Sequence, residues 1–121
     1  MIQPQPTPKV TQADVERLAR RDYPEDQVAQ VLRVLDEYGT AKWEVNTARV
    51  RAAILKLAKG DSSQVNRFVE AARTDFRDVL SEAEYPSFTK RWGDRYPLAK
   101  EEQQRVIEED RRQYQDWFRK E

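Results

Sequence analysis

Residues 75–86 read D-F-R-D-V-L-S-E-A-E-Y-P, and the rest of the chain can be organised around this stretch. Its apolar residues recur at the spacing of one helix face; they are Phe76, Val79, Leu80 and Ala83. The helix must end near Glu84, because Pro86 disfavours helical backbone in the residue before it and has no amide hydrogen. We expect the earlier helices to converge on this one and a later helix to pack over it.

The same apolar phase extends upstream to a predicted helix start at Asp61, where Gln64 completes a capping box of the D-x-x-Q kind. The apolar residues of this longer run are Val65, Phe68, Val69, Ala72, Phe76, Val79, Leu80 and Ala83. The unbroken phase favours one continuous helix over residues 62–84. The alternative is a break near Thr74 and Asp75, with Thr74 capping a second helix.

Glycines, prolines and capping residues divide the remaining sequence into further amphipathic helices. Their predicted ranges are about 11–21, 25–38, 46–59, 87–92 and 98–120. No stretch alternates as a strand would, so the prediction is all-α, a single small domain of five or six helices over residues 11–121. Residues 1–10, with three prolines at alternate positions, are predicted to be a flexible tail. Trp43, in a loop, is expected to cover the core.

Composition narrows the classes of function. The 121 residues include 22 Lys and Arg against 22 Asp and Glu, which argues against general electrostatic capture of nucleic acid. The sequence contains neither His nor Cys. Disulfides, Cys nucleophiles and His acid–base chemistry are therefore excluded, and zinc, iron–sulfur and haem sites lose their usual ligands. There is neither an apolar run of about 20 residues nor a signal-peptide pattern, so we expect a cytoplasmic protein without a membrane partner.

Residues 51–61 read R-A-A-I-L-K-L-A-K-G-D. With the stretch at 75–86, they resemble a group of short bacterial helical proteins of unknown function that share L-A-x-G-D followed by D-[YF]-R-D-V-L-x-x-A-E-Y-P. The similarity covers about residues 49–86, with a weaker match in R-R-Q-Y-Q-D-W at 111–117. The resemblance implies a bacterial, cytoplasmic, helical protein and no known activity. Where the shared motif has an aromatic after V-L-x, this chain has Ser-Glu at 81–82, so a role for that aromatic does not carry over.

Three carboxylates fall at i, i+3 and i+7 of the predicted helix; they are Asp75, Asp78 and Glu82. With another nearby Glu, they could hold Mg²⁺ or Ca²⁺ and support metal-assisted hydrolysis. The alternative, which we favour, is a solvated acidic face paired with Arg73 and Arg77. No second carboxylate pattern supplies ligands from another helix. We therefore predict no metal, no cofactor and no catalytic residue.

Aromatic and cationic residues alternate in the connection that follows this helix. Rings beside cations suit a protein interface, where Trp, Tyr and Arg are common anchors, and also single-stranded nucleic acid. Packing of the loop on the core is a third explanation. The balanced net charge favours a protein partner, and the predicted partner-binding surface consists of Asp78, Glu82, Tyr85, Arg91, Trp92 and Tyr96. The nucleic-acid alternative would use Lys90, Arg91, Trp92 and Arg95.

Three arginine clusters could meet an acidic partner or form solvated faces balanced by acidic neighbours, and we favour the second. The clusters are Arg17, Arg20 and Arg21, then Arg49 and Arg51, then Arg111 and Arg112. The functional prediction is a non-enzymatic module that binds another protein. An immunity or antitoxin-like role toward a toxin fits the size and the mixture of charges. The alternative is a nucleic-acid-binding accessory protein, and a homodimer through the last helix is left open.

Overall fold

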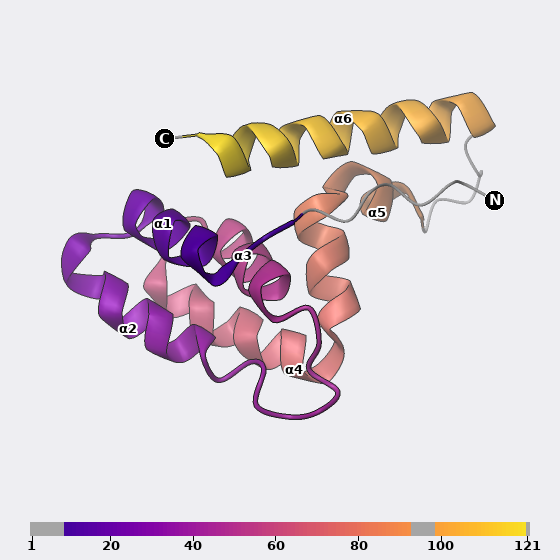
Figure 1. Cartoon of the computed structure of the whole chain (residues 1–121). Coiled ribbons are helices and arrows are strands. Elements are labelled where there is room, and N and C mark those ends of the chain that lie inside the picture. Colours follow the sequence, from indigo (N-terminus) through magenta and orange to yellow (C-terminus); the bar gives the residue numbers. More distant parts are fainter. Residues whose placement is uncertain (1–8, 93–98, 121) are drawn as a thin grey trace.

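The computed structural model describes residues 9–92 and 99–120, and it places six α-helices and no strand within them (Figure 1). The prediction of a small all-α fold is confirmed. Positions 1–8 of the predicted tail lie outside the described residues. The helices are α1 (Gln12–Asp22), α2 (Glu25–Leu35), α3 (Thr47–Ala58), α4 (Ser62–Glu84), α5 (Pro86–Trp92) and α6 (Lys100–Arg119). In the described part of the chain, none of these helices is both long and apolar enough to cross a membrane.

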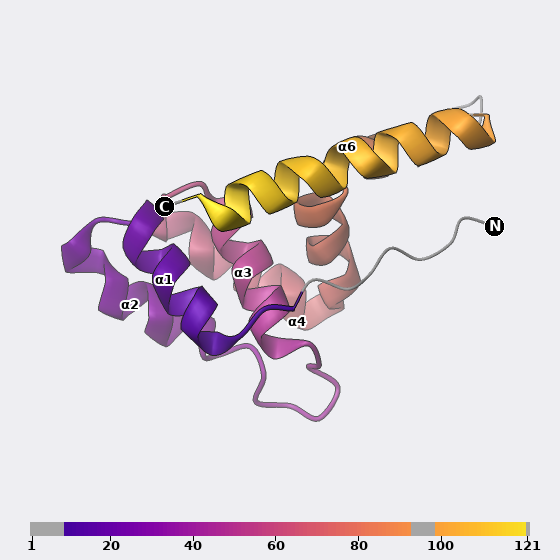
Figure 2. The same cartoon turned by 45° about the horizontal axis from the view of Figure 1, so that its top comes forward.

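The core is built around α3, which packs between α1 and α4, while α2 covers α4 and α1 from the other side (Figures 1 and 2). Most of α3 is buried because small and aliphatic residues occupy several of its faces; they are Val50, Ala52, Ala53, Ile54, Leu55 and Ala58. The alanines let neighbouring helices approach closely. Tyr23, in the corner between α1 and α2, donates its hydroxyl hydrogen to the Leu55 carbonyl at 3.0 Å and fixes that corner on α3.

A kink divides α4, and the prediction of one continuous helix is wrong. Asp75 has non-helical backbone angles, φ −156° and ψ 100°, and Figure 1 shows the two halves of α4 running in different directions. The Asp75 carboxylate caps the second half, because its Oδ1 accepts a hydrogen bond from the Arg77 backbone N–H at 3.1 Å. The predicted alternative cap, Thr74, instead donates its hydroxyl to the Glu70 carbonyl at 3.1 Å.

Two arginines of α1 hold the C-terminal end of α6. Arg17 Nη2 donates to the Phe118 carbonyl at 2.8 Å, and Arg21 Nη1 donates to the carbonyls of Trp117 at 2.5 Å and Lys120 at 2.6 Å. The guanidinium group of Arg17 also lies 5.3 Å from the centroid of the Phe118 ring, and that of Arg21 lies 5.2 Å from the centroid of the Trp117 ring. Final helix carbonyls lack helical partners and carry partial negative charge, so cations stabilise them. The predicted solvated face is therefore wrong for Arg17 and Arg21.

The second arginine cluster also has internal partners. Arg49 forms a two-pronged ion pair with the buried Glu84, with Nε 2.7 Å from Oε2 and Nη2 2.5 Å from Oε1. Arg51 donates to the carbonyls of Leu35 at 3.1 Å and Tyr38 at 2.7 Å, where α2 ends. Both arginines thus join helices within the chain, which corrects the prediction of a solvated face there.

Asp110 interrupts the apolar stripe of α6 because it serves α5. Its carboxylate is buried and accepts the backbone N–H groups of Ser87 at 3.1 Å and Phe88 at 2.8 Å, in the first turn of α5. These N–H groups have no partner within their own helix, so the carboxylate satisfies them. Arg111 and Arg112, which directly follow Asp110 in α6, are exposed.

The turn between α3 and α4 contains two neighbouring left-handed residues, Lys59 with φ 52° and Gly60 with φ 80°. A Cβ on Gly60 would lie 2.8 Å from the backbone carbonyl oxygen of Asp22, so Gly60→Ala should lower the free energy of unfolding by about 2 kcal/mol. Lys59→Gly should instead raise it by up to about 1 kcal/mol, because a left-handed backbone strains a side-chain-bearing residue. Urea unfolding measures both, and equal effects of the two changes would contradict this account.

The contacts between α1 and α6 give a second prediction. Arg21→Gln should accelerate amide hydrogen exchange in the last turn of α6 by about tenfold or more, because charge-assisted hydrogen bonds to two carbonyls are lost. Arg20→Gln is the matched control, since Arg20 is the neighbouring residue and is exposed. Hydrogen exchange read by mass spectrometry makes the comparison. Identical exchange in the two variants would show that Arg21 does not anchor α6.

Candidate functional site

The loop between α2 and α3 displays the most exposed large apolar side chains in the described part of the chain. Trp43 is 71% exposed and Val45 is 45% exposed. The expectation that Trp43 covers the core is therefore wrong, whereas Tyr38 is buried in the core. The Tyr38 hydroxyl donates to the Val45 carbonyl at 2.8 Å, which fixes the second half of the loop. We call residues 39–46 the tryptophan loop.

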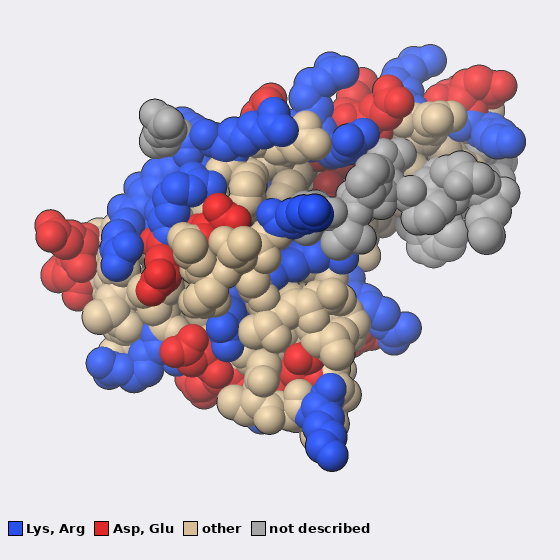
Figure 3. Space-filling model, viewed as in Figure 1, with Lys and Arg blue, Asp and Glu red and all other residues tan. Residues whose placement is uncertain are grey.

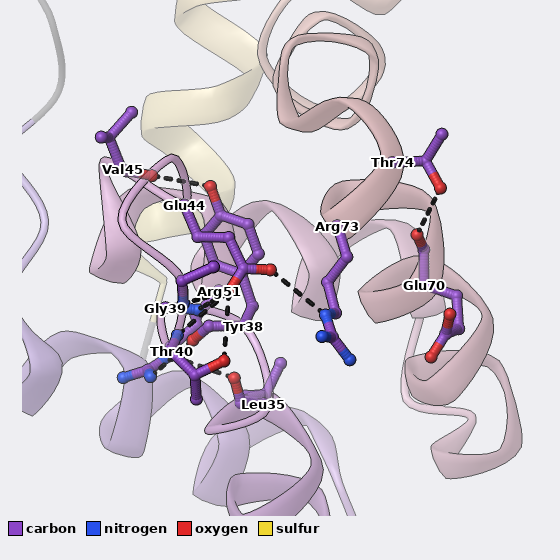
Figure 4. A network of polar contacts seen from close by, with 11 residues as sticks. Leu35, Tyr38, Gly39, Thr40, Glu44, Val45, Arg51, Glu70, Arg73 and Thr74 are labelled. Atoms are coloured by element: carbon purple, nitrogen blue, oxygen red, sulfur yellow. Dashed lines mark hydrogen bonds and ion pairs between the residues drawn. The ribbon is translucent and has the colours of Figure 1, made fainter.

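Glu44 organises the tryptophan loop from inside (Figure 4). Its side chain is buried, and Oε1 accepts the backbone N–H groups of Gly39 at 3.2 Å, Thr40 at 3.0 Å and Ala41 at 2.9 Å. Oε2 accepts the Nε–H of Arg73, from α4, at 3.2 Å. The Ala41 N–H, followed by that of Gly39 and by Arg73, lowers the pKa of Glu44, while burial opposes the shift. The carboxylate therefore stays ionised and ties the loop to α4.

The beginning of the tryptophan loop is fixed as tightly as its middle. Gly39 has φ +111°, and a Cβ there would lie 2.8 Å from Thr47 Cγ2, so the turn requires glycine. Arg51 holds the Tyr38 carbonyl next to it (Figure 4). Burial, and then the charge of Glu44, raises the pKa of Tyr38 to about 12, so its hydroxyl stays protonated and donates. The loop is consequently a rigid support for Trp43.

A groove of about 360 Å³ lies between the tryptophan loop and the kink of α4, and we call it the kink groove. It is lined by Tyr38, Trp43, Glu44, Ala72, Arg73, Thr74, Asp75, Phe76 and Arg77. Arg77 forks onto Asp75, with Nε 3.0 Å from Oδ1 and Nη2 3.1 Å from Oδ2. This contact, with the Arg77 backbone N–H, lowers the pKa of Asp75. The kink thus shapes the groove and places two guanidinium groups along it.

A second groove, of about 430 Å³, opens between the second half of α4 and α5, and its lining contains two of the six predicted partner-binding residues. The lining residues are Asp78, Ser81, Glu82, Phe88 and Thr89. Tyr85 is half-buried and does not line this groove. The side chains of Arg91 and Trp92, and all of Tyr96, lie outside the described residues.

The aligned carboxylates of the metal hypothesis do not form one row. The kink takes Asp75 out of the helical register of Asp78 and Glu82, and its carboxylate is occupied by Arg77. Within residues 9–92 and 99–120, no group of three or more His, Cys, Asp or Glu side chains could hold a metal ion.

Lys and Arg side chains gather over α1 and the C-terminal end of α6 (Figure 3). Arg17 and Arg21 belong to this basic area, but their guanidinium groups are occupied by the carbonyls of α6. Of the residues named for the nucleic-acid alternative, only Lys90 has a described side chain, and it is exposed. Two cations of this basic area, Arg17 and Arg21, thus hold α6 in place.

No protein-family model matches the chain, and no curated protein or solved structure is significantly similar to it. The resemblance to short bacterial helical proteins stays a prediction.

The network around Glu44 predicts how stability depends on pH. Because the pKa of Glu44 is lowered on folding, its contribution is fully present above the unfolded value of 4.5 and is lost as the pH falls through the folded pKa. Glu44→Gln should lower the free energy of unfolding by about 1 to 3 kcal/mol at neutral pH. The difference from wild type should shrink in acid.

The matched control is Glu70→Gln, because Glu70 is exposed and its carboxylate points away from Glu44 (Figure 4). This control should change stability little at any pH. Urea unfolding at several pH values tests both variants. A constant gap between wild type and Glu44→Gln down to strongly acidic pH would contradict the assigned role of the carboxylate.

Proposed function

We propose that this chain is a non-enzymatic interaction module that binds another protein through the tryptophan loop and the kink groove. The observation that carries the proposal is Trp43, an indole that is 71% exposed on a loop fixed from inside by Glu44. Trp is among the residues most enriched at the energetic centres of protein interfaces. An exposed Trp on a rigid support therefore favours a binding role.

Energetic reasoning supports this role for Trp43. Covering most of an indole removes on the order of 150 Å² of apolar surface from water, which corresponds to about 4 kcal/mol. Binding usually loses part of such a gain to the ordering of loops and side chains. Here the hydrogen bonds to Glu44 and from Tyr38 already order the loop backbone before any partner arrives.

The state of the carboxylates in the kink groove favours binding over catalysis. Glu44 accepts three backbone N–H groups and Arg73, and Asp75 accepts three N–H groups of Arg77. A general base needs an accessible lone pair and a pKa near the working pH. Both carboxylates have lowered pKa values and are held by internal donors, so they act as structural groups.

The second groove begins at Asp78, the residue after Arg77, and can extend the same binding surface. Asp78 and Glu82 are exposed there, and the half-buried Phe88, from α5, also lines the groove. A large partner could therefore contact both grooves. Neutralisation of a toxin, which the chain's size and charge mixture suggest, is one form that such binding can take.

Affinity capture tests the proposed function. Immobilised full chain is incubated with nuclease-treated lysate of its source organism at about 150 mM salt. Wild type should retain one stoichiometric protein. Trp43→Ala should retain at least about tenfold less of it, since a central Trp truncation commonly costs 2 kcal/mol or more.

Arg112→Ala, a change to an exposed residue of α6, is the matched control and should behave as wild type. Thermal unfolding should be the same for all three proteins, because Trp43 makes little contact with the core. Equal capture by wild type and Trp43→Ala would refute the proposed function. Retention of nucleic acid alone, in the absence of nuclease, would favour the nucleic-acid alternative.

A further inference from the structure

We infer that the kink groove accepts an acidic segment of the partner: a large apolar side chain against Trp43, flanked by Asp or Glu residues that pair with Arg73 and Arg77. The inference rests on the proposed function and names the chemistry of the partner. It follows from three features of the groove. The cations of its ion pairs are more exposed than the carboxylates, its guanidinium groups have N–H donors that the ion pairs do not use, and part of its lining is apolar.

Each ion pair of the groove turns its cation toward solvent and its carboxylate inward. The Arg73 side chain is 42% exposed, whereas that of its partner Glu44 is 1% exposed. The Arg77 side chain is 77% exposed, against 35% for Asp75. An approaching partner therefore meets guanidinium groups first. Coulomb interactions at such short range are strong enough to select the sign of the partner's charge.

The two guanidinium groups keep donors for a further carboxylate. Arg73 donates a hydrogen bond to Glu44 through Nε, and among the described residues its two Nη groups have no acceptor, so both can bind a carboxylate of a partner. Arg77 uses Nε and Nη2 on Asp75 and keeps Nη1. A planar guanidinium binds carboxylates in a two-pronged geometry, which an ammonium cannot do. Lys42, exposed beside Trp43 in the tryptophan loop, adds a third cation.

Two exposed carboxylates near Arg73 and Arg77 in the sequence, those of Glu70 and Asp78, do not line the kink groove. Glu70 lies one helical turn before Arg73, and its carboxylate points away from Glu44 and Arg73 (Figure 4). Asp78 follows Arg77 but lines the second groove instead. Arg73 and Arg77 thus line the kink groove, and Lys42 lies next to Trp43 in the sequence, outside that lining.

The lining supplies a place for one apolar side chain. The exposed Trp43, the half-buried Phe76 and the buried Ala72 are its apolar lining residues. At about 360 Å³ the groove is at the lower end of the range for specific ligand pockets. Such a volume suits one anchoring side chain of a peptide better than a run of stacked bases.

The test begins with a displayed library of random peptides of about 12 residues, selected on the full chain. Enriched peptides should carry a large apolar residue with at least two Asp or Glu close to it. The most enriched sequence, made as a fluorescent peptide, is then titrated against variants. Lys42→Glu and Arg77→Glu should each weaken binding by about tenfold, and Trp43→Ala by more.

Two variants distinguish a loss of binding from a loss of folding. Lys42 is exposed and forms no hydrogen bond or ion pair with another described residue, so Lys42→Glu should leave the circular dichroism spectrum and the unfolding midpoint unchanged. Arg112→Glu carries the same change of charge on α6 and should leave peptide binding unchanged. A peptide in which Lys replaces each acidic residue should bind Arg77→Glu better than it binds wild type.

The inference is overturned if no peptide is enriched, if the enriched peptides are neutral or basic, or if Lys42→Glu and Arg77→Glu bind them as wild type does. Equal or tighter binding of a labelled oligothymidine would overturn it in favour of single-stranded nucleic acid. If capture from lysate depends on Trp43 while acidic peptides fail, the proposed function stands and only the chemistry assigned to the partner fails. If capture is independent of Trp43, the proposed function itself fails.

Discussion

The buried carboxylate of Glu44 is the interaction on which the exposed features of this protein depend. One oxygen accepts three successive backbone N–H groups, and the other accepts an arginine from a helix that lies 29 positions further along the chain. Without this carboxylate, those N–H groups would lose their common acceptor inside the loop. With it, the neighbouring Trp43 is carried outward on a loop of defined shape. The exposed indole and the buried carboxylate that orders its loop therefore belong to adjacent residues, Trp43 and Glu44.

The kink at Asp75 gives the second half of the surface its form. A straight helix would present a continuous ridge, whereas the break turns α4 and leaves hollows on the two sides of residues 77 and 78. Asp75 both caps the new helix and pairs with Arg77, so one short side chain stabilises the break and fixes a cation at the groove. In the two ion pairs of the kink groove, the guanidinium group is consequently more exposed to solvent than the carboxylate.

Periodicity, glycines and prolines predicted the number of helices and most of their limits, because these features act within a few residues. The break near Asp75 was only the less favoured prediction because the apolar phase persists through it: Val79, Leu80 and Ala83 remain buried after the break. The orientation of Trp43 depends on which neighbour fills the core, and Tyr38 does so. Asp78 and Glu82 share a groove as their spacing suggests, but the roles of Arg17 and Arg21 depend on carbonyls about a hundred positions away.

The bonds from Arg17 and Arg21 to the last turn of α6 also constrain how the chain folds. They join residues separated by 96 to 103 positions, so their formation closes a loop that contains nearly the whole described protein. Closing so long a loop in an unfolded chain is entropically unfavourable, and contacts of this separation form slowly. Local packing of α3 on α4 shortens the effective loop first. The attachment of α6 is therefore expected late in folding, and its detachment early in unfolding.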